Sequence, residues 1–538
     1  MRLAALACGA ALACYALTAC SKSAGGSTAA PDRLRIALQI NPTQLDPILA
    51  QNSIESFADG LMFDLLVTLD RNHREIPDLA ATVPSLDNGG ISKDGLTITY
   101  HLRRGVKWHD GAPFTSRDVK FTWQAIMNPR NDVVSRRGYD EVASMDTPDH
   151  STVIMHMKRR FPPAVDTIFA ESDTPFRLLP AHLLATYDNL NHVAFNAAPI
   201  GTGPYEFVRW QRGDQIVLRA NSGYFRGAPA LRELTLPIIP DDNTIAAQLR
   251  SREVDLGIEI PAAVYRDVAG AAGVRRQLAD APAYTAVMFN TRRPPLDDVR
   301  VRRALVLGMD RPAITRDDTY GTGRVAVADL SPFYWAFDAA LRPTPYDPAQ
   351  ADALLDAAGW HTGSDGVRVR DGKRLSLVLA YGLASQIVRT ITAQIQQMYR
   401  SIGVEVELKG FDYATLYAAA QSGGILNGGK FDLAMYAWIA GADPDDSSQW
   451  TCAAIPPLGN NIARYCSPEM EAAQLLALST FDRSVRKRAY TRIQALLLRD
   501  APAAFIYYQA LRYAHADDLQ NFTPNGISEA WNAQEWRR

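Results

Sequence analysis

The sequence predicts an α/β fold of at least two domains, with an open, mostly parallel sheet in its C-terminal half. A strand–helix–strand pattern covers residues 375–408, and a nearly all-apolar strand follows at 431–439. The chain has 538 residues, whereas a single hydrophobic core stops growing near ~250–300 residues. We therefore expect several packed layers of helix and sheet, divided between domains.

The first twenty residues have the features of an exported lipoprotein. Arg2 is the only charged residue before an apolar run at 3–17, which is shorter than the ~20 residues that span a bilayer as a helix. Two small residues directly before Cys20 resemble the lipobox of bacterial lipoproteins, in which the signal is removed and the cysteine is acylated. This pattern predicts a signal peptide at 1–19 and lipidation of Cys20; an ordinary signal peptide with an incidental Cys20 is the alternative.

Composition limits the partners that the chain can have. Residues 20–31 are rich in Ser, Gly and Ala and predict a flexible tether behind the lipid. No later segment resembles a membrane span, so we expect membrane contact only through the lipid anchor, at the extracytoplasmic face of a bacterial membrane. The 56 Lys and Arg residues nearly balance the 58 Asp and Glu residues, which excludes the basic field of a nucleic-acid-binding protein.

Two cysteines remain in the body of the chain, Cys452 and Cys466. In an oxidising compartment, two cysteines this close predict a disulfide that closes a loop of about fifteen residues, worth ~3 kcal/mol by loop-closure entropy. Two buried free thiols are the alternative.

The N-terminal half contains one helix start with unusually complete capping chemistry. The segment 96–102 alternates apolar and polar residues, as a half-buried strand does. After it, Thr115 is a predicted N-cap with Asp118 three positions later, and Phe114 and Val119 stand where a hydrophobic staple has its two members. These features predict a helix that begins next to Thr115.

The C-terminal half contains the clearest strand–helix–strand unit. Asp347-Pro348 predicts a helix start, and Asp371-Gly372 predicts the turn of a hairpin within 366–379. Strands at 375–381 and 404–408 flank a helix with apolar residues at helical spacing. Such a crossover implies parallel strands, and ligands bind beyond the carboxyl ends of strands in such sheets. The loop 440–450, which follows the apolar strand, is therefore the expected ligand loop.

Five segments, in one order along the chain, resemble the bacterial extracellular solute-binding proteins of family 5, the oligopeptide- and dipeptide-binding group. The most specific is SKDGLTITYHLRRGVKWHDGAPFTSRDVKFTW at 92–123. The others are GTGPYEF at 201–207, VRRALVLGMDR at 301–311, YDPAQADALLDAAGW at 346–360, and Asp443-Pro444. The resemblance implies a two-lobed, periplasmic-binding-protein-like fold of type II with an extra inserted subdomain.

The resemblance also implies a division of the chain and a set of partners. Lobe I would comprise 32–52, an inserted subdomain at 53–198, 199–290 and the C-terminal 507–538, and lobe II would comprise 291–506. Such a protein, expected to be a monomer, would present peptides to the permease and ATPase subunits of an ABC importer. Members with this fold also bind metal chelates, haem, oligosaccharides or opines, or act as receptors, so the fold alone does not determine the ligand.

An enzyme is not expected. The chain has no GxSxG, HExxH or CxxC motif, and its nine histidines are scattered, with no metal-ligand spacing. Capping already explains Asp118, which stands near His109 and Asp110 in the 92–123 segment. We predict no cofactor and no metal site; a secreted hydrolase with a triad assembled in space is the remote alternative.

We expect the ligand cleft to be lined mainly by residues in and around the 440–450 loop. A carboxylate can bind the amine of a peptide, and aromatic side chains can form the walls. The predicted ligand-binding residues are Asn41, Tyr436, Trp438, Ala440, Asp443, Asp445, Asp446 and Trp450. In the alternative reading Asp445 or Asp446 caps a helix that starts near Ser447, and the two tryptophans are core residues.

One departure from the family pattern concerns the amine of the ligand. In the peptide-binding members this loop resembles an Asp followed three residues later by Asp/Glu-Pro, and that first Asp pairs with the α-ammonium of the peptide. Alignment on Asp443-Pro444 puts Ala440 at this position. A buried ammonium without a carboxylate partner is costly. We therefore expect Asp443, Asp445 or Asp446 to replace it, Asp443 first, or else a ligand without a free amine.

Overall fold

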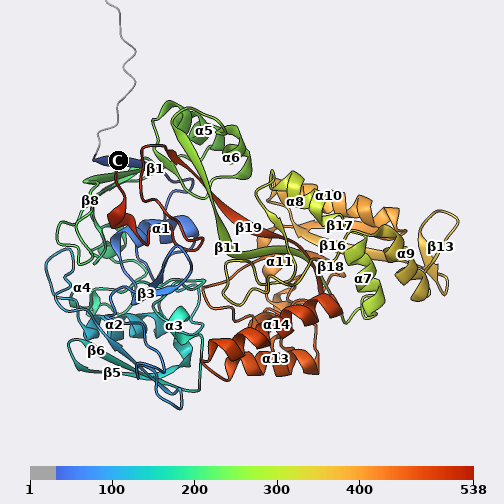
Figure 1. Cartoon of the computed structure of the whole chain (residues 1–538), viewed down its shortest axis with the longest axis horizontal. Helices are drawn as coiled ribbons and strands as arrows, with labels where there is room; N and C mark the ends of the chain where they lie inside the picture. Colours follow the sequence, from blue (N-terminus) through green and yellow to red (C-terminus); the bar gives the residue numbers. More distant parts are fainter. Residues whose placement is uncertain (1–31) are drawn as a thin grey trace, which may run out of the picture.

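The computed structural model describes residues 32–538; the predicted signal peptide, the lipidation site Cys20 and the tether lie outside these residues. Figure 1 shows two lobes. One is drawn from blue to green and the other from yellow to orange, and the two longest strands, β11 (Val274–Phe289) and β19 (Ala503–Ala516), run from one lobe into the other. The C-terminal segment after β19 returns to the first lobe, beside β1 (Arg33–Ala37).

One 11-stranded sheet passes through both lobes, in the order β17-β16-β18-β11-β19-β10-β1-β9-β8-β7, with β12 paired to β19. Its other strands are β7 (Tyr205–Gln211), β8 (Gln215–Ala220), β9 (Glu233–Pro237), β10 (Leu256–Gly257), β12 (Arg324–Val325), β16 (Ser376–Gly382), β17 (Glu405–Phe411) and β18 (Leu433–Ile439). Because β11 and β19 are antiparallel neighbours, the chain crosses between the lobes twice at the same place.

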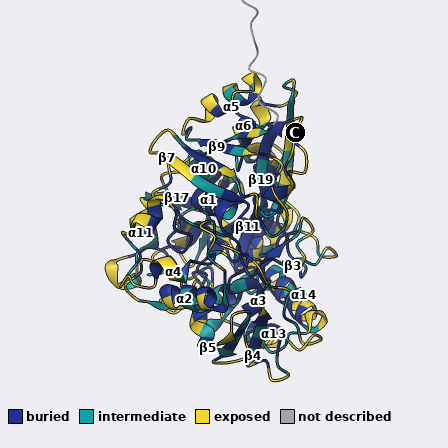
Figure 2. Ribbon diagram, turned by 90° about the vertical axis from the view of Figure 1, so that its left-hand side faces the viewer, coloured by how far each residue is buried: buried dark blue, intermediate teal, exposed yellow. Residues whose placement is uncertain are grey.

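The paired strands β11 and β19 change register where they pass between the lobes. The register shifts between Asp280 and Tyr284, so residues 281–283 have no regular partner on β19. A bulge of this kind bends a strand and increases its twist. Beyond the shift, Tyr284–Phe289 is buried between β18 and β19, and β11 lies in the dark centre of Figure 2. The predicted lobe boundaries at 290/291 and 506/507 stay predictions; we propose 281–283 as the crossing point on β11.

The predicted strand–helix–strand unit of lobe II is confirmed. Strands β16 and β17 are parallel over Ser376↔Glu405 to Gly382↔Phe411, and α10 (Gln386–Ser401) connects them. The expectation of a mostly parallel sheet is wrong beyond β18, which is parallel to β16 but antiparallel to β11. The reason is topological: the chain enters and leaves lobe II on neighbouring strands, so β11 and β19 must run in opposite directions.

Strand β18 is also less buried than its apolar sequence predicts. Its first four residues are buried, whereas Ala437 is exposed and Ile439 is 65% exposed. The carboxyl end of β18 leaves the lobe II core and reaches the space between the lobes. The apolar sequence therefore reflects two environments, the core and the wall of a cavity.

Helices cover both faces of the lobe II sheet. On one face α7 (Val299–Leu307), α9 (Pro348–Ala357) and α10 share a core with Leu377 and Leu433, and α8 (Arg311–Asp318) joins them. On the other face α13 (Pro468–Leu478) and α14 (Arg483–Asp500) share a core with Ala380 and Ala434. Successive strand residues point to opposite faces, which is why a strand with an apolar residue at every position fits here.

Smaller elements at the edge of lobe II also match the sequence. A hairpin sheet is formed by β13 (His361–Thr362), β14 (Arg368–Arg370) and β15 (Lys373–Arg374). Its turn is Asp371-Gly372, both with positive φ, as a tight hairpin turn requires. The side chain of Asp347 caps α9 by accepting a hydrogen bond from the backbone N–H of Gln350. Two short helices, α11 (Tyr413–Tyr417) and α12 (Ser447–Trp450), complete the lobe.

The region between α1 (Ser53–Met62) and β7 carries two small antiparallel sheets. These are β2 (Val67–Leu69) with β3 (Glu75–Pro77), and β4 (Thr97–His101), β6 (Thr152–Met157) and β5 (Val142–Asp149). Its helices are α2 (Ser116–Met127), α3 (Ala164–Thr167) and α4 (Ala181–Leu184). The predicted capping box at the start of α2 is confirmed. The side chain of Thr115 accepts from a backbone N–H in the first turn of the helix, and the side chain of Asp118 accepts from the backbone N–H of Thr115.

This region shares one continuous hydrophobic core with the rest of lobe I. Val119 and Ile98 belong to the same core cluster as Leu34 of β1, Leu218 of β8 and Trp536 near the C-terminus. Helices α5 (Asp242–Ser251) and α6 (Ala262–Asp267) form a separate small core against β1 and β19. The predicted inserted subdomain is therefore packed onto lobe I rather than hinged from it.

Candidate functional site

A cavity of about 420 Å³ lies between the lobes, at the register shift of β11. Its wall comes from distant parts of the chain: the start of α1, the inserted subdomain, the bulge of β11, the end of β18, β19 and the C-terminal segment. One residue from each is Ser53, Thr174, Pro282, Ile439, Gln509 and Ser528. The volume lies within the ~300–1,000 Å³ of typical small-molecule sites.

Four charged residues line this cavity: Asp173, Arg177, Glu259 and Glu529. Asp173 is exposed, Glu259 is half-buried, and Glu529 is only 5% exposed. Tyr513 donates its hydroxyl to Oε1 of Glu529 at 2.9 Å. Burial, with the nearby negative charge of Glu259 as the next cause, raises the pKa of Glu529 to about 8.

Glu259 follows the carboxyl end of β10, and Ser53 at the start of α1 donates its hydroxyl to Oε2 of Glu259 at 2.7 Å. Burial raises the pKa of Glu259. The backbone of Glu259 has a φ of +48°, which few residues with a side chain adopt. The fold thus holds two carboxyl groups in one poorly hydrated wall, and each is more easily protonated than in water.

Arg177 brings the only positive charge to the cavity wall among the lining residues. It is 5% exposed, and its side chain donates to the backbone oxygen of Pro175 at 3.3 Å. Burial raises the pKa values of Asp59 and Glu171, and the charge of Arg177 offsets part of this rise. Arg177 therefore balances the charge of buried acids behind the wall.

In the predicted ligand loop, Asp443 lies inside the protein. Its Oδ1 is 2.7 Å from Nη2 of Arg486, and both side chains are 4% exposed. Arg486 also donates to the backbone oxygen of Ala477 at 3.0 Å. Asp443 does not line the interlobe cavity. A buried charge pair with additional hydrogen bonds is a structural contact, and it occupies Oδ1 of the carboxylate that we expected to bind an amine.

Asp445 connects the two lobes. Its Oδ2 is 3.0 Å from Nη2 of Arg137, which belongs to the inserted subdomain. Next to it, the backbone N–H of Ala442 donates to the backbone oxygen of Glu171 at 2.9 Å. Oδ1 of Asp445 accepts from the backbone N–H of Ser447, the first residue of α12, whereas Asp446, the N-cap residue of this helix, makes no side-chain capping bond. The loop therefore carries contacts that hold lobe II against lobe I.

Asp446 and Trp450 belong to the interior of lobe II. Asp446 accepts from Gln474 at 2.6 Å, and burial, with the charge of nearby Asp329 next, raises its pKa well above the usual range. Trp450 is fully buried, donates its indole N–H to Asp329 at 2.8 Å and packs edge-on against Phe505. The core alternative therefore describes Trp450.

The remaining predicted residues are spread over several environments. Tyr436 is buried and stacks on half-buried Trp438, with ring centroids 6.1 Å apart. Trp438 lines a small hollow beside the loop together with Ala440, and Ala440 also lines the interlobe cavity. The backbone N–H of Ala440 donates to the backbone oxygen of Pro282 at 3.0 Å. Asn41 is exposed and lines neither space.

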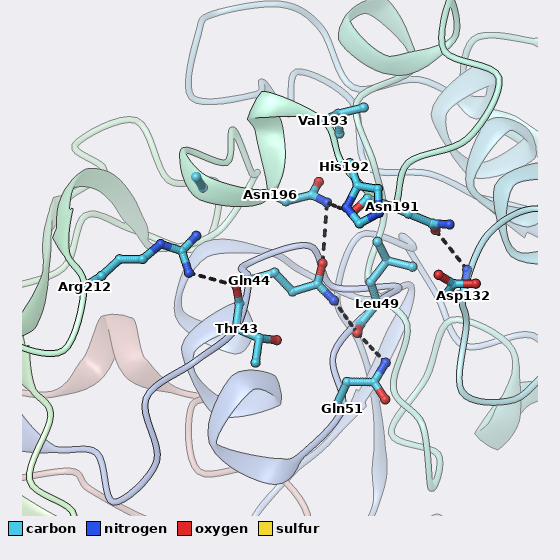
Figure 3. Close-up of a pocket in the computed structure, with 11 residues that line it drawn as sticks. Thr43, Gln44, Leu49, Gln51, Asp132, Asn191, His192, Val193, Asn196 and Arg212 are labelled. Carbon is cyan, nitrogen blue, oxygen red and sulfur yellow. Dashed lines mark hydrogen bonds between the residues drawn. The ribbon is translucent and has the colours of Figure 1, made fainter.

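Figure 3 shows a second cavity, of about 510 Å³, inside lobe I. Amide side chains from Gln44, Gln51 and Asn196 point into it, and Arg212 reaches the backbone oxygen of Thr43. No residue of lobe II contributes to its wall. A change in the angle between the lobes would not close it over a ligand, so the interlobe cavity is the better candidate.

Sequence reasoning missed Glu259, Glu529 and Arg177. Each stands in a segment without a recognisable motif, and they are separated by up to several hundred residues in the sequence. Glu529 lies in the C-terminal segment that returns to lobe I, and only the folded chain brings it to the cavity. No local pattern could have indicated these positions.

Two α/β lobes that share a pair of crossing strands and enclose a cavity of small-molecule size define a two-lobed solute-binding protein. The family model of the bacterial extracellular solute-binding proteins, family 5 Middle, matches residues 76–454. The chain belongs to this family, whose members are substrate-binding transport proteins of ABC importers and not enzymes. No helix in the described part, 32–538, is long and apolar enough to cross a membrane.

Individual relatives match over almost the whole chain. Protein XP55 of Streptomyces lividans is 29% identical over 505 residues, which cover 93% of this chain and 87% of that protein. Oligopeptide-binding protein AppA of Bacillus subtilis is 26% identical over 503 residues, covering 92% and 89%. NikZ of Campylobacter jejuni, solved with Ni(L-His), superimposes with a TM-score of 0.75 at 26% identity and covers 95% of this chain and 100% of that chain.

Proposed function

We propose that this protein captures short peptides between its lobes and delivers them to the permease and ATPase subunits of an ABC importer. The observation that carries the proposal is the cavity at the crossing strands, with walls from both lobes. Its volume of about 420 Å³ lies toward the lower end of small-molecule sites and favours short peptides over long ones. The name of AppA, an oligopeptide-binding protein, supports a peptide as the class of solute.

Capture in this proposal depends on closure of the lobes. The ion pair between Arg137 and Asp445 and the hydrogen bond from Ala442 to Glu171 would both break if the lobes separated. A peptide that contacts both walls adds to these contacts in the closed form only, so it shifts the population toward that form. The bulge at 281–283 is the place where the strands can change their bend.

A metal–amino acid chelate is the second candidate, because the NikZ structure contains Ni(L-His). Within residues 32–538 no group of three or more His, Cys, Asp and Glu side chains is arranged to hold a metal ion directly. In a chelate the amino acid itself supplies ligands to the metal. An assay that identifies the bound solute therefore distinguishes a chelate from a peptide.

Native mass spectrometry of the protein as purified, followed by calorimetry with a library of di- to pentapeptides and with Ni(L-His), tests the proposal. We expect peptide binding, a smaller radius of gyration in small-angle scattering, and a gain in stability of RT ln(1 + [L]/Kd), which is about 2.7 kcal/mol at 100 times Kd. A tightly bound chelate in place of any peptide, or a ligand that changes neither the radius nor the melting temperature, contradicts it.

The anchoring of this function at the membrane is a separate proposal that depends on Cys20. Cys20→Ala is expected to leave the chain unprocessed by the lipoprotein peptidase and unlabelled by radioactive palmitate. Palmitate label that persists on the variant contradicts lipidation at this residue.

A further inference from the structure

Two acids in the wall of the interlobe cavity lack an ion-pair partner in the described part of the chain. Three of the four charged lining residues are acids, and the fourth, Arg177, forms no ion pair with Glu259 or Glu529 among residues 32–538. The contacts of Glu259 and Glu529 are to the hydroxyls of Ser53 and Tyr513. In the part of the chain that the structure describes, neither carboxylate forms an ion pair with a Lys, Arg or His side chain.

Glu529 has an unused acceptor in this wall. Its side chain is more than nine-tenths buried, and Tyr513 occupies Oε1. Oε2 has no hydrogen-bond partner among residues 32–538, and Glu529 lines the cavity. A carboxylate oxygen in the cavity wall that accepts from no protein donor is available to a donor group of a solute.

Glu259 makes a cation the favoured donor. Burial raises the pKa of both acids, and the negative charge of Glu259 raises the pKa of Glu529 further. A neutral donor would satisfy one oxygen and leave the repulsion in place. An ammonium group has three N–H donors and a positive charge, so it can satisfy oxygens of both carboxylates and cancel their repulsion.

We infer that Glu259 and Glu529 form a receptor for a primary ammonium group of the solute, on the lobe I side of the cavity. The inference rests on the proposed function only in taking this cavity as the solute site. It moves the amine contact from the 440–446 loop of lobe II to the end of β10 and the C-terminal segment. The ammonium can be the free N-terminus of a peptide or belong to an amine that is not a peptide.

A cycle of ligand and protein changes tests this inference. Calorimetry is run with the di- to pentapeptide library, with the same peptides N-acetylated, and with 1,4-diaminobutane. On the unaltered protein, acetylation is expected to weaken binding by at least about tenfold. Glu529→Gln and Glu259→Gln are each expected to weaken binding of the free peptides by a similar factor. In either variant, acetylation should then have a much smaller effect, because the contact that it removes is already lost.

Three variants serve as controls. Glu407→Gln changes an exposed acid on β17 and should leave affinity unchanged. Asp173→Asn changes the third acid of the cavity wall and should have less effect than Glu529→Gln. Equal losses for Asp173→Asn and Glu529→Gln would mean that only the overall negative charge matters, which overturns the inference. Melting curves of every variant show whether it is folded. The comparison of free and acetylated peptides uses the unaltered protein, so it does not depend on the folding of any variant.

The outcomes separate the inference from the proposed function. Peptides that bind equally well with and without an acetyl group overturn the ammonium receptor and leave peptide capture intact. Binding of 1,4-diaminobutane that Glu529→Gln abolishes, without binding of any peptide, supports the receptor and overturns peptide capture. Failure of all three kinds of probe to bind contradicts both.

Discussion

This molecule has two acid-rich regions, one in each lobe, and their carboxylates have different kinds of partner. In the 440–446 loop of lobe II, Asp443 pairs with Arg486 and Asp445 pairs with Arg137. In the lobe I wall, Glu259 and Glu529 are held only by hydroxyl groups. The loop acids therefore hold the protein together, whereas the wall acids remain open to a ligand. Acids that are neighbours in sequence are easy to recognise, but only their partners decide whether they are free to bind.

Asp443→Ala is the strongest test of the structural side of this comparison. Removing one member of a buried pair leaves Arg486 charged and unpaired, so we expect the free energy of unfolding to fall by about 3–5 kcal/mol. Chemical denaturation measures this. The double variant with Arg486→Met, which removes the stranded charge, should recover much of the loss. A nearly unchanged stability in Asp443→Ala would mean that this acid is free, as the loop hypothesis assumed.

The predicted disulfide between Cys452 and Cys466 is present in the structure, just after the loop. Replacing both cysteines with serine opens a loop of about fifteen residues and is expected to lower the free energy of unfolding by ~3 kcal/mol. Denaturation with and without reductant gives the value on the unaltered protein as a control. Because the bridge lies outside the cavity wall, peptide affinity at a temperature where the variant stays folded should change little.

The acids of the lobe I wall are expected to make the stability of the protein depend on pH. The pKa of Glu529 is about 8 in the folded protein against 4.5 in a free side chain. Between pH 4.5 and 8 the folded state therefore holds a proton that the unfolded chain has released. Its contribution favours folding at low pH and is lost as pH rises through this window, on the order of 1 kcal/mol per pH unit.

Glu529→Gln should remove this dependence. When both proteins are measured from pH 5 to 8, the free energy of unfolding of the variant should rise relative to that of the unaltered protein as pH rises, because only the unaltered protein loses stability at this position. Parallel curves would show that the pKa of Glu529 is the same in the folded and the unfolded state, which contradicts this prediction.

Asp445→Asn is expected to have the smallest effect. The partner Arg137 is 38% exposed, so solvent screens this ion pair, and we expect a loss of at most ~1 kcal/mol in the free energy of unfolding. Its effect should appear instead in closure: without ligand, the radius of gyration should rise toward that of an open form. An unchanged radius, with Arg137→Gln behaving in the same way, would assign lobe closure to other contacts between the lobes, such as those of Ala442 with Glu171 and of Arg160 with Ser479.

The sequence by itself determined the local elements and the architecture of the protein. The capping box before α2, the turn at Asp371-Gly372 and the β16–α10–β17 unit follow from spacing, because capping, tight turns and helical periodicity depend on residues only a few positions apart. The resemblance of five segments to the family 5 solute-binding proteins implied two lobes, and the family match agrees.

Only the tertiary structure decided which acids are free. Charge pairing depends on groups brought together over long distances: Arg486 is 43 residues from Asp443, and Arg137 is 308 residues from Asp445. Glu259 and Glu529 meet because β10, β19 and the C-terminal segment pack in lobe I. The sequence does not show whether a carboxylate is paired with an arginine or lines a cavity without an ion-pair partner. Burial and pairing in the folded chain decide which of the two applies.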